Sequence, residues 1–246
     1  MRFSGKKMDN IVETLRYVDL KFKEIQEILV KDIKKEEKCE FLKQRTADIL
    51  SNLNKCYDYC VFILAQKVDF SSLNESDQKK IKKSYRYFPF SKRKLEEPLY
   101  QGIKIIEPDL FNYLSNLVDK ITGNAQVETN VPNTHSDLRY GMAKEIHDLC
   151  NTDKHQKPLE IIEVPKTKAR VEQANGMIVE ISLLNCKGSF PELYLPISAN
   201  GKGYIGNSYK VPGFSQELEM FLSHRIGITK QIVKEFAALL GTTVSF

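Results

Sequence analysis

Several features that mark common classes of protein are missing from this sequence. Residues 1–7 contain no apolar stretch of the kind found in a signal peptide, and no window approaches eighteen uninterrupted apolar residues. We therefore expect a cytoplasmic protein that does not span a membrane. The five cysteines are odd in number and contain no CxxC pair, which argues against a disulfide framework and against a zinc site.

The usual signatures of enzymes are also missing. The sequence contains no GxSxG or HExxH motif, no kinase motif set and no Rossmann fingerprint. A glycine-containing stretch at 201–206 lacks the strand–loop–helix context of a phosphate-binding loop, so hairpin glycines are the better interpretation. No carboxylate cluster or Cys/His spacing suits a metal, and we predict neither a metal nor another cofactor.

The overall composition is that of an ordinary globular protein. The 246 residues are 41% hydrophobic and 28% charged, and the net charge is +5. This length allows one large domain or a domain with an appendage. The mild positive charge permits contact with nucleic acid but is more typical of a solvated basic surface.

The first part of the chain has apolar residues at helical spacing. Over residues 8–33 they are separated alternately by four and three positions, at Ile11, Leu15, Val18, Phe22, Ile25 and Leu29. A second long helix is predicted over 40–67, after a charged turn or helix continuation at 34–38. A short link between two such helices predicts an antiparallel hairpin. The apolar seam either packs within the bundle or joins two chains, and we expect a homodimer.

The remaining patterns predict further helices and then a change of period. We expect helices over 77–87, 107–121, 136–152 and 228–240, with an irregular loop over 91–102. Strands are expected over 159–164, 177–184, 192–197 and 204–211, with a hairpin turn at Asn175-Gly176. The predicted fold is mainly α with a C-terminal antiparallel β element (α+β). Residues 1–158 form a helical domain, and 159–246 form a β-hairpin subdomain whose C-terminal helix packs back on the bundle.

Polar residues of four kinds gather where the helix over 136–152 ends. They are Asn151, Asp153, Lys154 and His155. His147, Asn151 and His155 are spaced by four, and Arg139 precedes His147 by eight, so a continuing helix places all four on one side. Such a stripe suits phosphate binding by arginine and proton transfer by histidine. The alternative is a structural network that caps the helix end.

The second predicted helix carries a polar stripe of its own. Asp48, Asn52, Lys55 and Tyr59 are spaced by four, three and four, and Asp58 lies beside them. If the two helices are neighbours, Asn52 or Asp58 would reach the Asn151–His155 cluster and orient its imidazole. A solvated outer face is the alternative. The stripe is rich in Asn, Asp and Tyr, which favours a polar network between the helices.

These motifs resemble those of bacterial HEPN-like helical proteins. The resemblance rests on Leu50-x-Asn52-Leu53 with Tyr57-Asp58, on Phe88-Pro89, and on the ending Asn151-x-Asp153-Lys154-His155. It covers about residues 40–160, and the Asp-Lys-His part is its most specific piece. The chain departs from the family pattern in having seven residues between Arg139 and His147, Lys55 at an expected arginine, and Gln156 after His155.

The resemblance implies a HEPN-like bundle and a role in bacterial defence or a toxin–antitoxin system. It implies a metal-independent endoribonuclease that acts on RNA, commonly as a homodimer, with a partner protein from the same system. His155 would be the acid or base, Asn151 and Asp153 would orient it, and Lys154 or Arg139 would stabilise phosphate charge. His147 and Lys55 would bind substrate, with Asn52 and Asp58 in support. The alternative function is a non-catalytic binding, scaffold or sensor protein whose Asn-x-Asp-Lys-His cluster is structural.

Overall fold

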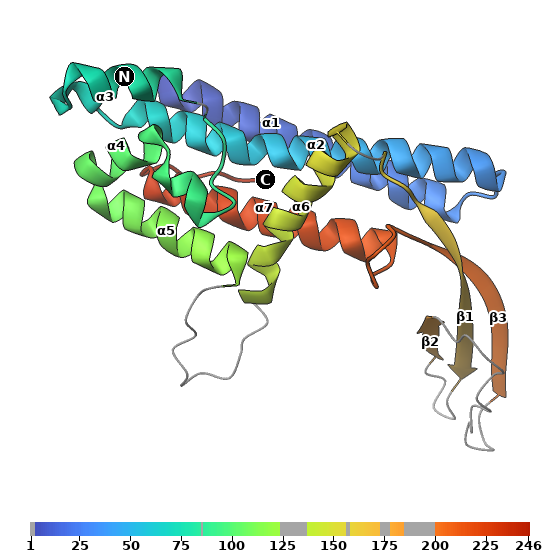
Figure 1. Ribbon diagram of the computed structural model, residues 1–246. Coiled ribbons are helices and arrows are strands. Elements are labelled where there is room, and N and C mark those ends of the chain that lie inside the picture. The colour runs from blue at the N-terminus through green and yellow to red at the C-terminus, as the bar shows by residue number, and fades with distance from the viewer. Residues whose placement is uncertain (1–2, 85, 124–136, 156–157, 173–177, 185–199) are drawn as a thin grey trace.

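The protein is mainly helical and carries a small antiparallel sheet (Figure 1). The computed structural model describes residues 3–84, 86–123, 137–155, 158–172, 178–184 and 200–246. Within these ranges it does not describe the side chains of residues 3–7, 137–139, 154–155, 165–172, 178–184 and 200–207. Over the described ranges, no helix combines the length and the hydropathy needed to cross a membrane.

Two long helices, α1 (Phe3–Val30) and α2 (Lys35–Lys67), lie side by side and form the predicted hairpin. The apolar seam of α1 faces inward: Ile11, Leu15, Val18 and Ile25 are fully buried within the single chain. The seam is therefore not the surface of a dimer, because its side chains are already covered by the bundle. The link is shorter than expected, because α2 begins at Lys35.

The short elements after α2 position a loop against the core. The 3-10 turn η1 (Phe70–Ser72) precedes α3 (Glu75–Lys83), where the side chain of Asn74 accepts a hydrogen bond from the Asp77 backbone N–H. The irregular loop predicted over 91–102 is wrong, because η2 (Lys92–Glu96) and α4 (Pro98–Ile106) occupy it. Proline at the first position starts both α4 and α5 (Pro108–Thr122).

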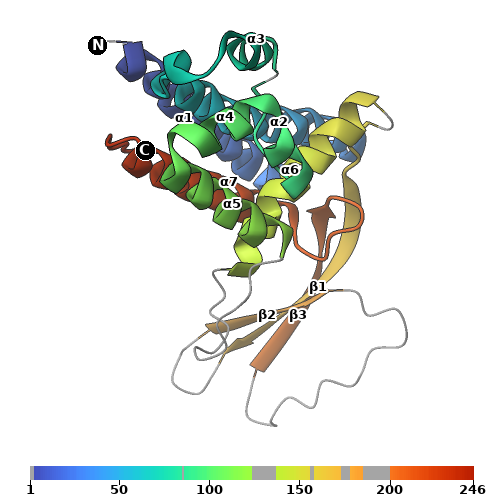
Figure 2. The same cartoon turned by 60° about the vertical axis from the view of Figure 1, so that its left-hand side comes forward.

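The last two helices complete the bundle. Helix α6 (Asp137–His155) crosses α2, and α7 (Leu218–Leu239) returns to pack on α1, α2 and α6 (Figures 1 and 2). Helix α7 begins ten residues before the predicted start. Arg225 of this helix is 1% exposed. Its guanidinium pairs with Glu145 of α6 and lies 3.5 Å from the Phe221 ring centroid, which explains how a charge is tolerated there.

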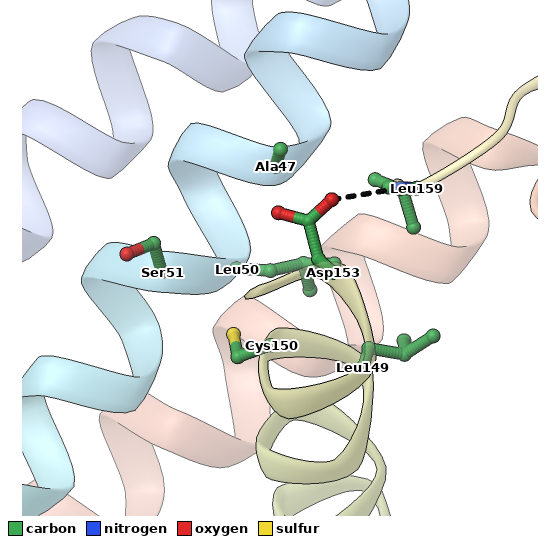
Figure 3. A pocket seen from close by; sticks show the side chains of 7 residues that line it. All are labelled: Ala47, Leu50, Ser51, Leu149, Cys150, Asp153 and Leu159. Atoms are coloured by element: carbon green, nitrogen blue, oxygen red, sulfur yellow. Dashed lines mark hydrogen bonds between the residues drawn. The ribbon is translucent and has the colours of Figure 1, made fainter. Parts of the chain in front are cut away.

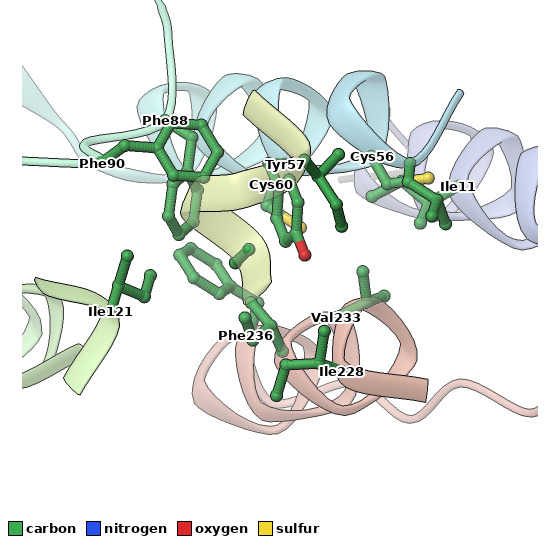
Figure 4. Packing of buried hydrophobic residues seen from close by; sticks show 14 of the residues in the cluster. Ile11, Cys56, Tyr57, Cys60, Phe88, Phe90, Ile121, Ile228, Val233 and Phe236 are labelled. Atoms are coloured by element: carbon green, nitrogen blue, oxygen red, sulfur yellow. The ribbon is translucent and has the colours of Figure 1, made fainter. Parts of the chain in front are cut away.

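Aromatic side chains from three separate segments meet in the core (Figure 4). Tyr57 of α2 lies 5.2 Å from Phe88, and Phe88 lies 5.9 Å from Phe236 of α7, measured between ring centroids. The Tyr57 hydroxyl is paired with Thr229 Oγ1 at 2.8 Å, so this buried polar atom has a partner. The core thus fixes the 88–90 segment against α2 and α7.

The sheet extends away from the bundle (Figure 2). Its strand order is β2 (Ile178–Leu184), β1 (Ile162–Glu172), β3 (Asn200–Lys210), and both pairings are antiparallel. The predicted turn at Asn175-Gly176 and the predicted strand at 192–197 lie outside the described residues. At the base of the sheet, Glu163 accepts a hydrogen bond from Tyr209 and pairs with Lys35 at 2.7 Å. These contacts attach the sheet to the start of α2.

Candidate functional site

The crossing of α2 and α6 brings together an imidazole and two amides. His147 Nδ1 lies 3.2 Å from Asn54 Oδ1, and His147 Nε2 lies 3.0 Å from Asn151 Nδ2. Asn54 belongs to α2, whereas Asn151 lies one turn beyond His147 on α6. The imidazole is half-buried and Asn151 is exposed. One ring nitrogen thus contacts α2, while the other contacts Asn151 at the solvent-exposed side of the ring.

With the two amides placed in this way, the contacts favour one tautomer of the neutral ring. An amide oxygen only accepts, so Nδ1 carries the proton and donates it to Asn54. An amide nitrogen only donates, so Nε2 accepts from Asn151 and keeps its lone pair. The arrangement stabilises the neutral Nδ1–H tautomer, whose basic nitrogen points toward the exposed amide.

The segment at 88–90 completes the site from the other side. The Phe90 ring stacks on the His147 ring, with centroids 4.3 Å apart and planes inclined by 21°. The Asp58 carboxylate accepts a hydrogen bond from the Phe88 backbone N–H at 3.1 Å. Asp58 is one turn from Asn54 on α2, so the same face of α2 holds both the imidazole and the segment that stacks on it.

The end of α6 has a different arrangement. Asp153 Oδ1 accepts a hydrogen bond from the Leu159 backbone N–H at 2.7 Å (Figure 3). The pocket beneath it is lined by Ala47, Leu50, Ser51, Leu149, Cys150, Asp153 and Leu159, and its cavity volume is about 40 Å³. That space admits a few water molecules and is far smaller than the roughly 300–1,000 Å³ of a ligand pocket. Asp153 therefore closes the chain after α6.

Two of the predicted site residues, Asn52 and Lys55, make their side-chain hydrogen bonds to neighbours on α2. The amide of Asn52 donates to the backbone oxygen and the carboxylate of Asp48, each at 2.9 Å, and Lys55 is exposed beside it. The physical reason is helical rotation, because Asn52 and Asn54 differ by about 200° around α2. Asn52 thus faces Asp48 and not Asn54's partner His147, while Asp58 accepts a hydrogen bond from the Phe88 backbone N–H. The predicted contact of Asn52 or Asp58 with His155 stays a prediction, because the His155 side chain lies outside the described residues.

Three other predicted residues are described only in part. The backbone of α6 is helical through His155, so His147, Asn151 and His155 follow one another at one-turn spacing. The side chains of Arg139, Lys154 and His155 lie outside the described residues. Their predicted roles stay predictions.

Sequence reasoning missed Asn54 and Phe90. It also missed the basic character of the segment on both sides of Phe90. Phe90 follows the Phe88-Pro89 pair that was recognised, but nothing local indicates that its ring stacks on a histidine. The basic segment did have a signal: residues 79–94 contain eight Lys and Arg and no Asp or Glu. The small net charge of the whole chain conceals it.

No known relative indicates what this site does. Comparison with protein-family models, with curated proteins and with solved structures found no match. Among the described residues, no group of three or more His, Cys, Asp or Glu side chains is arranged to hold a metal ion. The chemical groups at the site are an oriented imidazole, two amides and a stacked aromatic ring.

Proposed function

We propose that this protein is an endoribonuclease that works by imidazole acid–base catalysis, of the bacterial defence or toxin type that its HEPN-like motifs resemble. The observation that supports it best is the pairing of His147 Nδ1 with Asn54, which leaves the basic Nε2 directed toward an exposed and displaceable side chain. A base oriented by a fixed partner on its other nitrogen is the arrangement used in many hydrolytic sites.

RNA supplies its own nucleophile for this reaction. His147 Nε2 takes the proton of a ribose 2′-hydroxyl, and the 2′-oxygen forms a bond to the adjacent phosphorus. The bond from phosphorus to the 5′-oxygen breaks, and that oxygen receives a proton from a second group. We assign this acid role to His155, two turns further along α6, with Lys154 and Arg139 stabilising the phosphate. Asn151 would move from Nε2 as the substrate binds.

Incubation of the purified protein with total RNA and tRNA, with and without EDTA, tests the proposal. We expect cleavage products that end in a 2′,3′-cyclic phosphate, at equal rates with and without EDTA. His147→Ala and His155→Ala should each lower the rate by about a hundredfold or more. Circular dichroism checks that both variants are folded. Equal RNA profiles for folded wild-type and variant proteins would refute the nuclease function.

A second candidate function is a non-catalytic binding or scaffold protein. The contact from Asp153 to Leu159 favours it, because part of the Asn-x-Asp-Lys-His motif is then occupied in closing a helix end. In that case His147→Ala leaves every RNA profile unchanged and lowers the melting temperature, since it strands Asn54 and uncovers Phe90. The same pair of measurements therefore separates the two functions.

We also propose that the active form is a homodimer, as is common among the nucleases that the motifs resemble. Since the apolar seam of α1 is buried within the chain, another surface must join the copies. Light scattering at micromolar concentration should give twice the chain mass of 28.3 kDa. A mass of one chain would contradict the dimer and leave the imidazole chemistry to be judged by cleavage alone.

A further inference from the structure

A strongly basic region lies next to the candidate site, on α3 and η2. Residues 75–97 hold eight Lys and Arg against four Asp and Glu, a net charge of +4, while the whole chain has a net charge of +5. The positive charge of the protein is thus concentrated in this one segment. Such concentration is the electrostatic footprint of a polyanion-binding surface.

The surface in this region is hollowed. Lys80 and Lys83 of α3 and Ser84 after it line a groove with Glu97 and Pro98, where α4 begins, and the groove has a volume of about 370 Å³. Two carboxylates face this area. Glu97 pairs with Lys94 at 2.6 Å, and Asp77 pairs with Lys80 at 3.0 Å. Both pairs join residues close together on the chain and remain accessible to solvent on at least one side, so a phosphate can compete with the carboxylates for the lysines.

Other cations of the segment have no such partner. Lys82, Lys83 and Arg93 make no ion pair with any carboxylate among the residues that the structure describes, and all three are exposed. Their charges are therefore available for a ligand. Lys83 contributes directly to the groove, while Lys82 and Arg93 add to the field around it.

An aromatic side chain lies close to the groove. Tyr87 is 49% exposed, and the ammonium of Lys94 lies 6.0 Å from its ring centroid. An exposed ring beside cations is what single-stranded nucleic acid needs, since bases stack on the ring while lysines follow the phosphates. A membrane surface or an acidic peptide would not require the ring.

The groove is connected to the imidazole site by a short piece of chain. Three residues after Tyr87, the Phe90 ring stacks on His147. An extended chain advances about 3.3–3.6 Å per residue, and the Phe90 N–H bonds back to the Phe88 carbonyl, so this segment spans less than about 10 Å. We propose that the groove lined by Lys80 and Lys83, with Lys94 and Tyr87 beside it, binds the backbone of single-stranded RNA and leads the strand to His147. This proposal rests on the proposed function.

Binding is best measured with a strand that resists cleavage. Fluorescence anisotropy of a labelled 2′-O-methyl RNA of about 12 nucleotides uses the complete wild-type chain and lacks the 2′-hydroxyl that cleavage needs. Lys80→Gln/Lys83→Gln should weaken binding about tenfold at 50 mM salt and reduce the slope of log K against log salt by about 1.4. Tyr87→Leu should weaken binding about tenfold through lost stacking.

A matched control variant removes the same number of positive charges at a different place on the surface. Lys23→Gln/Lys31→Gln removes two exposed cations, one from α1 and one directly after it, and it should change affinity by less than about twofold. Equal losses in the two double variants, or no effect of Lys80→Gln/Lys83→Gln, would overturn the proposal. So would tighter, groove-dependent binding to phosphatidylserine vesicles than to the RNA strand. Groove-dependent RNA binding without cleavage of natural RNA would support this surface and refute the nuclease function.

Discussion

Helix α2 carries two polar faces that look alike in sequence and act differently in the fold. On one face, Asn54 and Asp58 bond to His147 and to the Phe88 backbone, and so connect α2 to other segments. On the other face, Asn52 bonds to Asp48, which accepts a hydrogen bond from Tyr17 of α1. The first face builds the candidate site, whereas the second stays within the α1–α2 hairpin.

The two faces differ in the direction in which their side chains point around the helix axis, and not in the chemical groups that they carry. Asn52 and Asn54 have identical side chains, but two residues along a helix rotate the side chain by about 200°. Only one of them can then face α6. The polar residues of a helix should therefore be assigned to a site by the element that each one faces.

The largest expected difference is in catalysis. Asn54→Ala removes the acceptor that fixes the tautomer of His147, so RNA cleavage should fall by about a hundredfold, or about 2.7 kcal/mol of transition-state stabilisation. Asn52→Ala removes the same chemical group from the other face and should leave the rate within about twofold. Single-turnover cleavage of a labelled RNA measures both.

A conservative variant sharpens this comparison. Asn54→Asp keeps an acceptor opposite His147 Nδ1 and should recover most of the rate that Asn54→Ala loses. Equal rates for Asn52→Ala and Asn54→Ala in folded proteins would show that the two faces do not differ in function.

The next effect concerns the end of α6. Asp153→Ala leaves the buried Leu159 without its hydrogen-bond partner and should lower the free energy of unfolding by about 1–3 kcal/mol. Asp153→Asn keeps an acceptor and should cost less. Urea denaturation followed by circular dichroism measures the difference. Unchanged stability in Asp153→Ala would return this carboxylate to the list of catalytic candidates.

The effect that is smallest at neutral pH involves the apolar face of α2. Burial raises the pKa of the Cys56 thiol from 9.0 to about 12. Between these values the unfolded chain loses the proton that the folded chain keeps, so stability is full below pH 9 and falls as the pH rises toward 12. The slope for one group is at most about 1.4 kcal/mol per pH unit. Cys56→Ala should flatten the fall, as thermal unfolding at several alkaline pH values would record.

A control for this measurement is Cys39, which is only half-buried. Burial also raises its pKa, although less than that of Cys56. Cys39→Ala should therefore change the alkaline slope less. If the two variants have the same slope, burial on the apolar face is not what sets the titration of Cys56.

Much of the fold follows from periodicity in the sequence. The seam from Ile11 to Leu29 predicts α1, and Pro108 with Asp109 predicts the start of α5. Periodicity did not predict the elements whose helical structure depends on tertiary packing. The first half of α7 was missed because the sequence near His224 and Arg225 suggests a turn, whereas in the fold Phe221 and Glu145 stabilise a buried Arg225 within the helix.

Less of the site followed from the sequence. The one-turn spacing of His147 and Asn151 was visible and matches a hydrogen bond between them. The partner on α2 was assigned to Asn52 or Asp58, because sequence does not give the rotation of α2 relative to α6. The stacking of Phe90 depends on a contact between segments more than fifty residues apart, which no local pattern encodes.

The place of α7 in the core also determines when this protein can fold during its synthesis. Phe221, Ile232 and Phe236 of α7 fill the space between α1, α2 and α6, and Leu218 follows Val30 by 188 positions. At about 5–20 residues per second, a ribosome needs roughly 10–40 s to make that stretch. During this interval the inner faces of α1 and α2 are uncovered, and they are the surfaces that a chaperone would bind on the nascent chain.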